Sequence, residues 1–241
     1  MGRKSETLAY QFIESYNRID KALREIYNLK PTFSFSDVVR RAATMSSVVK
    51  KYEDELVDYG RLRNAIVHRA TDEPIAEPHE DVVDKIEHIE RVITTPPLAL
   101  QTVGNRAVTS VDATISFGDL LKEMYKTGYS NIPVYLEKTL IGVVNRKMVV
   151  DAVGRFLARE NEGIDKLFEQ KVIDALSVNA ITSHYEVVSH TATIDQVLFM
   201  FQQNRKLSTI IITKGGNYSE KPLGIVATAD VIDMQNILDK Y

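Results

Sequence analysis

Two stretches in the second half of the chain resemble each other, and any fold must account for both. The sequence VTSVDATI at 108–115 matches VVSHTATI at 187–194, 79 residues later. LIGVVNRKMV matches LGIVATADVI, which places Gly142 82 residues before Gly224, and the three extra residues fit a longer hairpin at TKGGNYSEKPLG. Each copy reads strand, helix, strand, turn, strand, helix. Because a copy this small has little core, we expect the two copies to cover each other's sheets about a pseudo-twofold axis.

The first 93 residues follow a different, helical pattern. Apolar residues recur at three- and four-residue steps from Leu8 to Ile26, from Val49 to Ile66 and from Val82 to Ile93. Ser34 or Ser36 is a plausible N-cap for a helix after Pro31. The stretch TTPP at 94–97 marks the boundary. We expect a mixed α+β chain: an all-α bundle at 1–93, a βαββα domain at 97–157, a linker helix at 158–177 and a second βαββα domain at 178–241.

Composition excludes several classes of protein. There are no cysteines, so disulfides, thiolate metal sites and cysteine nucleophiles are excluded, and a cytoplasmic location is expected. The net charge of -3 does not favour DNA or RNA. No apolar run approaches the roughly 18 residues of a membrane span. The histidines lack metal-ligand spacing, so no metal is expected.

The repeat resembles the tandem cystathionine-β-synthase (CBS) domain pair over roughly residues 97 to 240. The likeness is carried by the ATI opening of each copy, by SNIPVY, and by a glycine before a hydrophobic strand and a helix start. It implies an adenine nucleotide (AMP, ADP or ATP) or a related adenosyl ligand in a cleft between the copies. The family's Gly-h-h-Ser/Thr-x-x-Asp run implies that a hydroxyl and the helix N-terminus hold phosphate and that the aspartate accepts hydrogen bonds from the ribose.

The second copy keeps more of that run than the first. Asp230 stands at the ribose position, with Val226 in the preceding strand, but Ala227 replaces the hydroxyl residue and Thr228 comes one residue late. In the first copy Met148 replaces the aspartate, although Arg146 and Lys147 could meet a phosphate. The resemblance therefore implies one competent site, and its expected walls are Ile181, Thr182, Thr209 and Ile210. The alternatives are that Asp230 is only an N-cap and that Arg146 and Lys147 are a solvated helix start.

A second resemblance concerns RNAIVH at 63–68. Arg63 falls inside an apolar stripe, and Asn64 and His68 lie one helical turn apart. The pattern resembles the HEPN domain (higher eukaryote and prokaryote nucleotide-binding) over roughly residues 1 to 93. Many such domains are dimeric, metal-independent RNases. That would make His68 a general acid or base and Arg63 a stabiliser of the transition state, with Asn64 orienting it. The alternatives are that Arg63 pairs with an acid such as Glu55 or Asp58, and that His68 caps a helix.

Three functions remain open. The first is a sensor in which a nucleotide near Asp230 changes the helical region or its dimer. The second is an endoribonuclease gated by that ligand, with RNA as its substrate. The third is a dimerising scaffold with a degenerate pocket. Both resemblances imply a homodimer.

Overall fold

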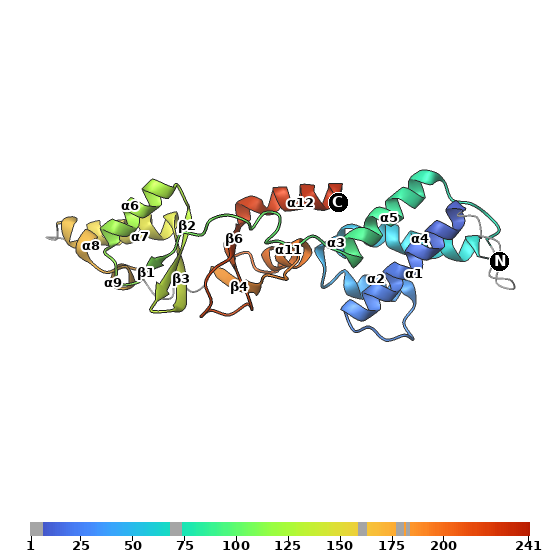
Figure 1. Cartoon of the computed structure of the whole chain (residues 1–241), viewed down its shortest axis with the longest axis horizontal. Coiled ribbons are helices and arrows are strands. Elements are labelled where there is room, and N and C mark those ends of the chain that lie inside the picture. Colours follow the sequence, from blue (N-terminus) through green and yellow to red (C-terminus); the bar gives the residue numbers. More distant parts are fainter. Residues whose placement is uncertain (1–6, 68–73, 159–162, 177–180, 182–183) are drawn as a thin grey trace. The chain divides into compact units, whose positions relative to one another are not determined.

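The computed structural model describes residues 7–67, 74–158, 163–176, 181 and 184–241 (Figure 1). The chain divides into two compact units. The first unit holds the residues up to Pro97 together with Thr193–Phe199 and Asn236–Tyr241. The second unit holds Leu98–Ala192 and Met200–Gln235. Helices fill the N-terminal region and strands begin only after it, so the predicted mixed fold class with an N-terminal helical region is confirmed.

Five helices make up most of the first unit: α1 (Leu8–Ile26), α2 (Phe35–Ala42), α3 (Ser47–Lys51), α4 (Glu53–Ile66) and α5 (Glu80–Thr94). Helix α1 packs along α5, and α2 packs on α4. The predicted face of α1 is the buried one, since Phe12, Ile19 and Leu23 are fully buried. Ser34 caps α2 by accepting a hydrogen bond from the Asp37 amide at 3.2 Å, which decides between the two serines considered.

The apolar stripe from Val49 to Ile66 does not form one helix. Helix α3 ends at Lys51, and Tyr52 leaves the helical conformation with φ -104° and ψ 18° before α4 begins at Glu53. The Tyr52 side chain is 4% exposed, and its hydroxyl lies 3.3 Å from His88 Nε2 on α5. The helix is therefore interrupted at the buried Tyr52, where the apolar periodicity alone predicts one continuous helix.

The first unit also contains the start of α11 (Ile194–Gln203), where Asp195 meets α3. Its Oδ2 accepts a hydrogen bond from Ser46 Oγ at 2.7 Å, and its Oδ1 accepts one from the Val48 amide at 2.8 Å. Burial raises the pKa of the Asp195 carboxyl above its ordinary value, and the hydrogen bonds from Ser46, Val48 and Ser47 offset only part of that effect. The ionised carboxylate is therefore held at a cost in the folded protein.

This raised pKa predicts how stability depends on pH. The ordinary pKa of 3.8 applies in the unfolded chain, so between 3.8 and the raised value the folded protein binds more protons than the unfolded one. The free-energy cost of ionising the buried Asp195 carboxyl is absent at low pH and fully present above the folded pKa. Asp195→Asn keeps an acceptor for the Val48 amide but does not titrate. We expect the Tm of the wild type, relative to this variant, to fall as pH rises from 4 to 7. A Tm difference that is constant with pH contradicts the assignment.

The second unit contains two three-stranded sheets of the same topology, ordered β1-β2-β3 and β4-β5-β6. In each, the first pair is parallel and the second antiparallel. The strands are β1 (Val111–Asp112), β2 (Asn131–Leu136), β3 (Thr139–Asn145), β4 (Tyr185–Ser189), β5 (Thr209–Thr213) and β6 (Gly224–Ala227). The helices that follow them are α6 (Phe117–Thr127), α7 (Arg146–Leu157), α8 (Asp165–Glu169), α9 (Val172–Ala175), the 3₁₀ turn η1 (Thr228–Asp230) and α12 (Val231–Lys240), whose last residues belong to the first unit.

Strand pairing corrects the register of the sequence repeat at its start. Val111 pairs with Val134, which pairs with Gly142; in the second sheet Val188 pairs with Ile212, which pairs with Gly224. Val111 is therefore equivalent to Val188, 77 residues later, and the two ATI triplets at an offset of 79 are not equivalent. The local turns agree, because Asp112 accepts from the Thr114 amide as Ser189 does from the Thr191 amide. The 82-residue offset of the glycines holds.

Buried side chains of the described residues form a large group in the first repeat and a smaller group between the two sheets. The larger group fills the first repeat and includes Leu167 and Val172 of α8 and α9, so the stretch expected to be a linker helix supplies core residues as two short helices. The smaller group joins Leu140 and Val143 of β3 to Tyr185 and Ile211 of the second sheet. The two sheets therefore cover part of each other's surface.

Candidate functional site

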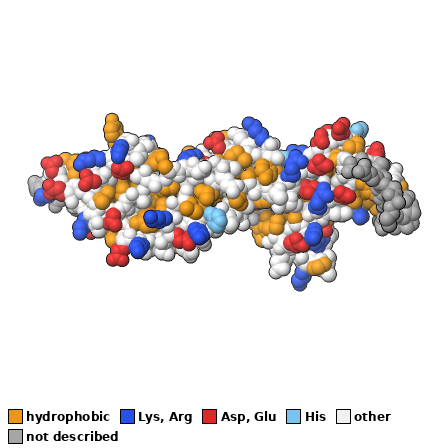
Figure 2. Space-filling model, in the orientation of Figure 1, with side chains coloured by type: hydrophobic (Ala, Val, Ile, Leu, Met, Phe, Trp, Pro, Cys, Tyr) orange, Lys and Arg blue, Asp and Glu red, His pale blue; other side chains and the backbone are white. Residues whose placement is uncertain are grey.

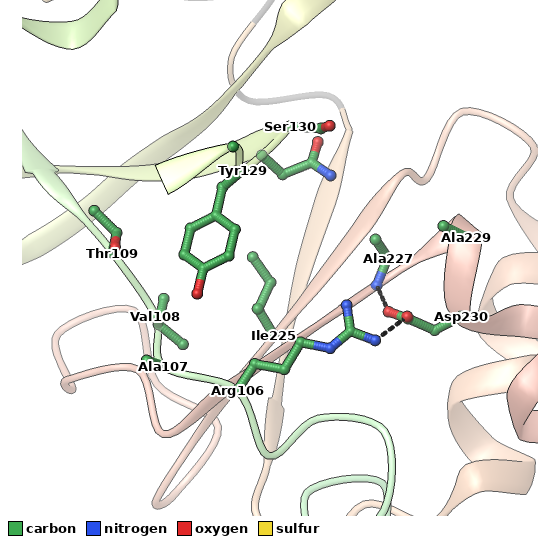
Figure 3. A pocket seen from close by; sticks show the side chains of 12 residues that line it. Arg106, Ala107, Val108, Thr109, Tyr129, Ser130, Ile225, Ala227, Ala229 and Asp230 are labelled. Carbon is green, nitrogen blue, oxygen red and sulfur yellow. Dashed lines mark hydrogen bonds and ion pairs between the residues drawn. The ribbon is translucent and has the colours of Figure 1, made fainter. Parts of the chain in front are cut away.

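A cavity of about 240 Å³ in the second unit brings three separate segments together (Figure 3). The first is the stretch before β1, the second is the turn between α6 and β2, and the third is the end of β6 with η1. Its lining consists of Arg106, Ala107, Val108, Thr109, Gly128, Tyr129, Ser130, Asn131, Ile225, Ala227, Ala229 and Asp230. The site therefore combines elements of both repeats.

Backbone geometry fixes two of these segments. The Ile225 amide donates a hydrogen bond to Gly104 O at 3.3 Å, so the stretch that leads to Arg106 lies against β6. Gly128 ends α6 with φ +70°, a conformation that glycine adopts without a steric penalty, and its amide donates to Met124 O. This left-handed turn sends the chain directly into Tyr129 and β2.

Asp230 is the one buried acid at this cavity among the described residues. The residue is 3% exposed, and its Oδ2 accepts a hydrogen bond from the Ala227 amide at 2.8 Å. The predicted helix start is present, but Asp230 is not its N-cap residue: Ala227 is, and the Asp230 carboxylate satisfies the Ala227 amide from within the turn. Oδ2 is therefore hydrogen-bonded to the backbone, and Oδ1 is left to bind another group.

Arg106 supplies the partner of that second oxygen, and the sequence reasoning missed it. Its Nη2 donates to Asp230 Oδ1, and the arginine side chain is 48% exposed (Figure 3). Arg106 is 124 residues from Asp230 in sequence, and no periodicity or spacing joins the two. The sequence signal that could have drawn attention to Arg106 is a basic residue shortly before β1, the first strand of the first repeat.

Most of the other residues expected to contact a ligand do not line this cavity. Val226 is fully buried, while its neighbours Ile225 and Ala227 face the cavity, because side chains alternate between the two faces of a strand. Thr209 and Ile210 are fully buried in β5, the central strand of its sheet. Thr228 is exposed on η1.

Ile181 lies elsewhere, and Thr182 falls outside the described residues. Ile181 is buried in the first repeat's core and packs over Gly142, where an added Cβ would lie 2.6 Å from Ile181 Cβ. Of the expected walls, the three that the structure describes, Ile181, Thr209 and Ile210, are therefore absent from the lining of this cavity.

In the first repeat, the residues named as possible ligand contacts bind other residues of the same repeat. Met148, which is equivalent to Asp230, is 5% exposed, and its amide donates to the Asn145 cap at 3.0 Å. Lys147 pairs with Asp151 at 2.8 Å, one helical turn on. Arg146 donates to Gly128 O at 2.9 Å and so steadies the turn that carries Tyr129.

The structure describes residues 63–67 of the RNAIVH stretch. Arg63 lies on α4, and its Nε is buried without a hydrogen-bond partner in the part of the chain that the structure describes. Asp58, a suggested partner, pairs with Arg61 at 2.8 Å. Asn64 is exposed, and α4 ends at Ile66. His68 lies outside the described residues, so the catalytic pair stays a prediction.

Other features of the surface bear on the choice of partner. On the face shown in Figure 2, acidic and basic side chains are interspersed. The described residues contain no group of three or more His, Cys, Asp or Glu placed to hold a metal ion. No helix among them is long and apolar enough to cross a bilayer.

Comparison with known proteins identifies one family. The CBS domain family matches residues 89–155, which begin within α5, include β1 to β3 of the first repeat and end within α7. No curated protein matches the chain.

Several solved structures match part of the chain at low identity. A CBS-domain containing protein from Agrobacterium tumefaciens is 18% identical with a TM-score of 0.41, covering 54% of this chain and 85% of its own. A CBS-domain containing protein from Bacillus anthracis is 19% identical with a TM-score of 0.45 and coverages of 59% and 94%. The CBS domain of a bacterial CNNM/CorC family Mg²⁺ transporter in complex with ATP is 20% identical with a TM-score of 0.42 and coverages of 65% and 96%. The family match over residues 89–155, carried by the first repeat, supports a CBS-domain protein.

Proposed function

We propose that this chain is a sensor of an adenine nucleotide or a related adenosyl ligand, which binds in the cavity at Asp230 and changes the state of the helical region. The observation that carries the proposal is the arrangement of Asp230 itself. Its carboxylate is buried at the cavity, one oxygen is held by the Ala227 amide, and the other is bonded to a half-exposed arginine. A half-exposed arginine can move away, so that oxygen can be offered to a ligand.

The chemistry of the lining suits the three parts of a nucleotide. A ribose diol can donate to Asp230 Oδ1 in place of Arg106. The aromatic ring of Tyr129 and the apolar side chains of Val108 and Ile225 offer surface for a purine. Once released from Asp230, the Arg106 guanidinium can bind a phosphate with two hydrogen bonds.

This division of roles predicts how Arg106 discriminates between ligands. In Arg106→Ala we expect the affinity for AMP to fall about 10- to 100-fold, because the charge-assisted hydrogen bonds to the phosphate are lost while the release of Asp230 from Arg106 offsets part of that loss. The affinity for adenosine should stay the same or rise, because adenosine has no phosphate and its ribose no longer displaces Arg106. Isothermal titration calorimetry with adenosine, AMP, ADP, ATP, S-adenosylmethionine and NAD measures both effects, with GTP for comparison.

Arg155→Ala is the matched control, because Arg155 is an exposed arginine on α7 that makes no ion pair with the described residues. Its affinities should equal those of the wild type. An equal loss for adenosine and AMP in Arg106→Ala contradicts the role of Arg106. Failure of every adenosyl ligand to bind the wild type rejects the proposed function.

A further inference from the structure

The short helix α3 is held at both of its ends by acidic residues from distant parts of the sequence. At its start, Ser46 Oγ donates to Asp195 of α11 at 2.7 Å and accepts from the Val49 amide at 3.0 Å. The Val48 amide donates to the same carboxylate at 2.8 Å. The first amides of α3 are therefore satisfied jointly by its own cap and by α11.

At the other end, Lys51 pairs with Asp239 in the last turn of α12. The Lys51 ammonium also lies 5.1 Å from the centre of the Tyr52 ring, and the Tyr52 hydroxyl reaches His88 of α5. The same residue thus joins α12 to the bend between α3 and α4. All of these contacts lie within the first unit.

The two helices that hold α3 also belong to the second repeat. Helix α11 follows β4 and is capped by Thr193, whose hydroxyl accepts a hydrogen bond from the Gln196 amide at 3.2 Å. Asp195, which binds α3, therefore lies in the first turn of α11. Helix α12 begins at Val231, the residue after Asp230, and ends at Lys240 beside Asp239. A change at Asp230 therefore occurs at one end of a helix whose other end carries the partner of Lys51.

From this we infer that α3 is the element through which the helical region responds to the second repeat, with Asp195 and the Lys51–Asp239 pair as its two attachments. The inference rests on the proposed function for the identity of the ligand. The attachments themselves are contacts within the first unit and can be tested without a ligand.

The first experiment is amide hydrogen exchange on the full chain. In Asp195→Ala the Ser46 hydroxyl and the Val48 amide lose their acceptor, and we expect the amides of residues 47–52 to exchange roughly fivefold faster or more. Exchange in α1 should stay as in the wild type. Lys51→Ala should also accelerate exchange in α3, whereas its neighbour Lys50→Ala, which loses only a local pair with Glu53, should not. Unchanged α3 exchange in both Asp195→Ala and Lys51→Ala overturns the inference.

The second experiment repeats the exchange measurement with AMP at saturation, with binding followed by calorimetry. In the wild type AMP should change the exchange of α3. In Lys51→Ala, AMP should bind within about threefold of the wild-type affinity while the α3 response is lost. AMP that binds the wild type without altering α3 overturns the inference but leaves the proposed function standing. Absence of binding by AMP and the other adenosyl ligands rejects the proposed function and this response with it, while the exchange data without ligand still decide the two attachments.

Discussion

Replacing Asp230 with alanine is expected to weaken the binding of both adenosine and AMP by about 100-fold or more. The change removes the proposed acceptor of the ribose hydroxyls, and hydrogen bonds to a charged group contribute about 1.5–3 kcal/mol each. It also leaves the Ala227 amide without its acceptor, so the turn that forms one wall of the cavity loses its internal support. Isothermal titration calorimetry on the purified full chain measures the loss.

Two further variants separate the causes. Asp230→Asn keeps an acceptor for the Ala227 amide but removes the charge, and we expect a smaller loss of about tenfold. Asp233→Ala changes an exposed acid three residues later, on α12, and should bind as the wild type does. Wild-type affinity in Asp230→Ala shows that the ligand binds elsewhere.

Gly224→Ala is expected to destabilise the chain by about 3 kcal/mol, the upper part of the range for overpacking a well-packed site. A Cβ at this position would lie 2.2 Å from Gly104 O and 2.7 Å from Leu100 Cδ1. The oxygen is backbone and cannot rotate away, so β6 and the stretch before Arg106 must separate. Chemical denaturation followed by circular dichroism measures the loss.

Gly154→Ala is the matched control for this substitution. Nothing lies within 4 Å of a Cβ added to Gly154 on α7, so only the lower entropy cost of alanine in a helix acts there, and a gain of roughly 0.5–1 kcal/mol is expected. Equal stabilities of the two variants would show that β6 and Gly104 are not in close contact. A further sign of the separation is weaker AMP binding in Gly224→Ala, since Arg106 is carried by the displaced stretch.

The order of the elements could be predicted from the sequence because the repeat is real at its second half. Gly142 and Gly224, which the repeat aligns, lie on equivalent strands of the two sheets. The start of the repeat was misaligned because Ala-Thr-Ile occurs at two non-equivalent places: Ser116 caps α6 after the first triplet, whereas Thr193 within the second triplet caps α11. The bend at Tyr52 was missed because both segments keep the same apolar spacing. Periodicity reports which face is buried, and it does not report a single non-helical residue.

Of the residues named from the sequence for a ligand site, Asp230 lines the cavity, and the others that the structure describes do not. Asp230 follows a glycine and a strand in a recognisable run, so it could be found locally. Arg106 and Tyr129 line the same cavity only because the first copy packs beside the second. A single sequence does not reveal tertiary packing of this kind. Val226 was named where Ile225 and Ala227 line the cavity, because a shift of one residue along a strand moves a side chain to the opposite face.

The ion pair between Arg106 and Asp230 gives the proposed site a competitor that is part of the same chain. A ligand that needs Asp230 must first displace it, so the measured affinity is the difference between two interactions and not the strength of one. The concentration at which such a sensor responds can then be adjusted through residues that hold or release Arg106. Adjustment of this kind leaves the proposed ribose contact at Asp230 itself unchanged.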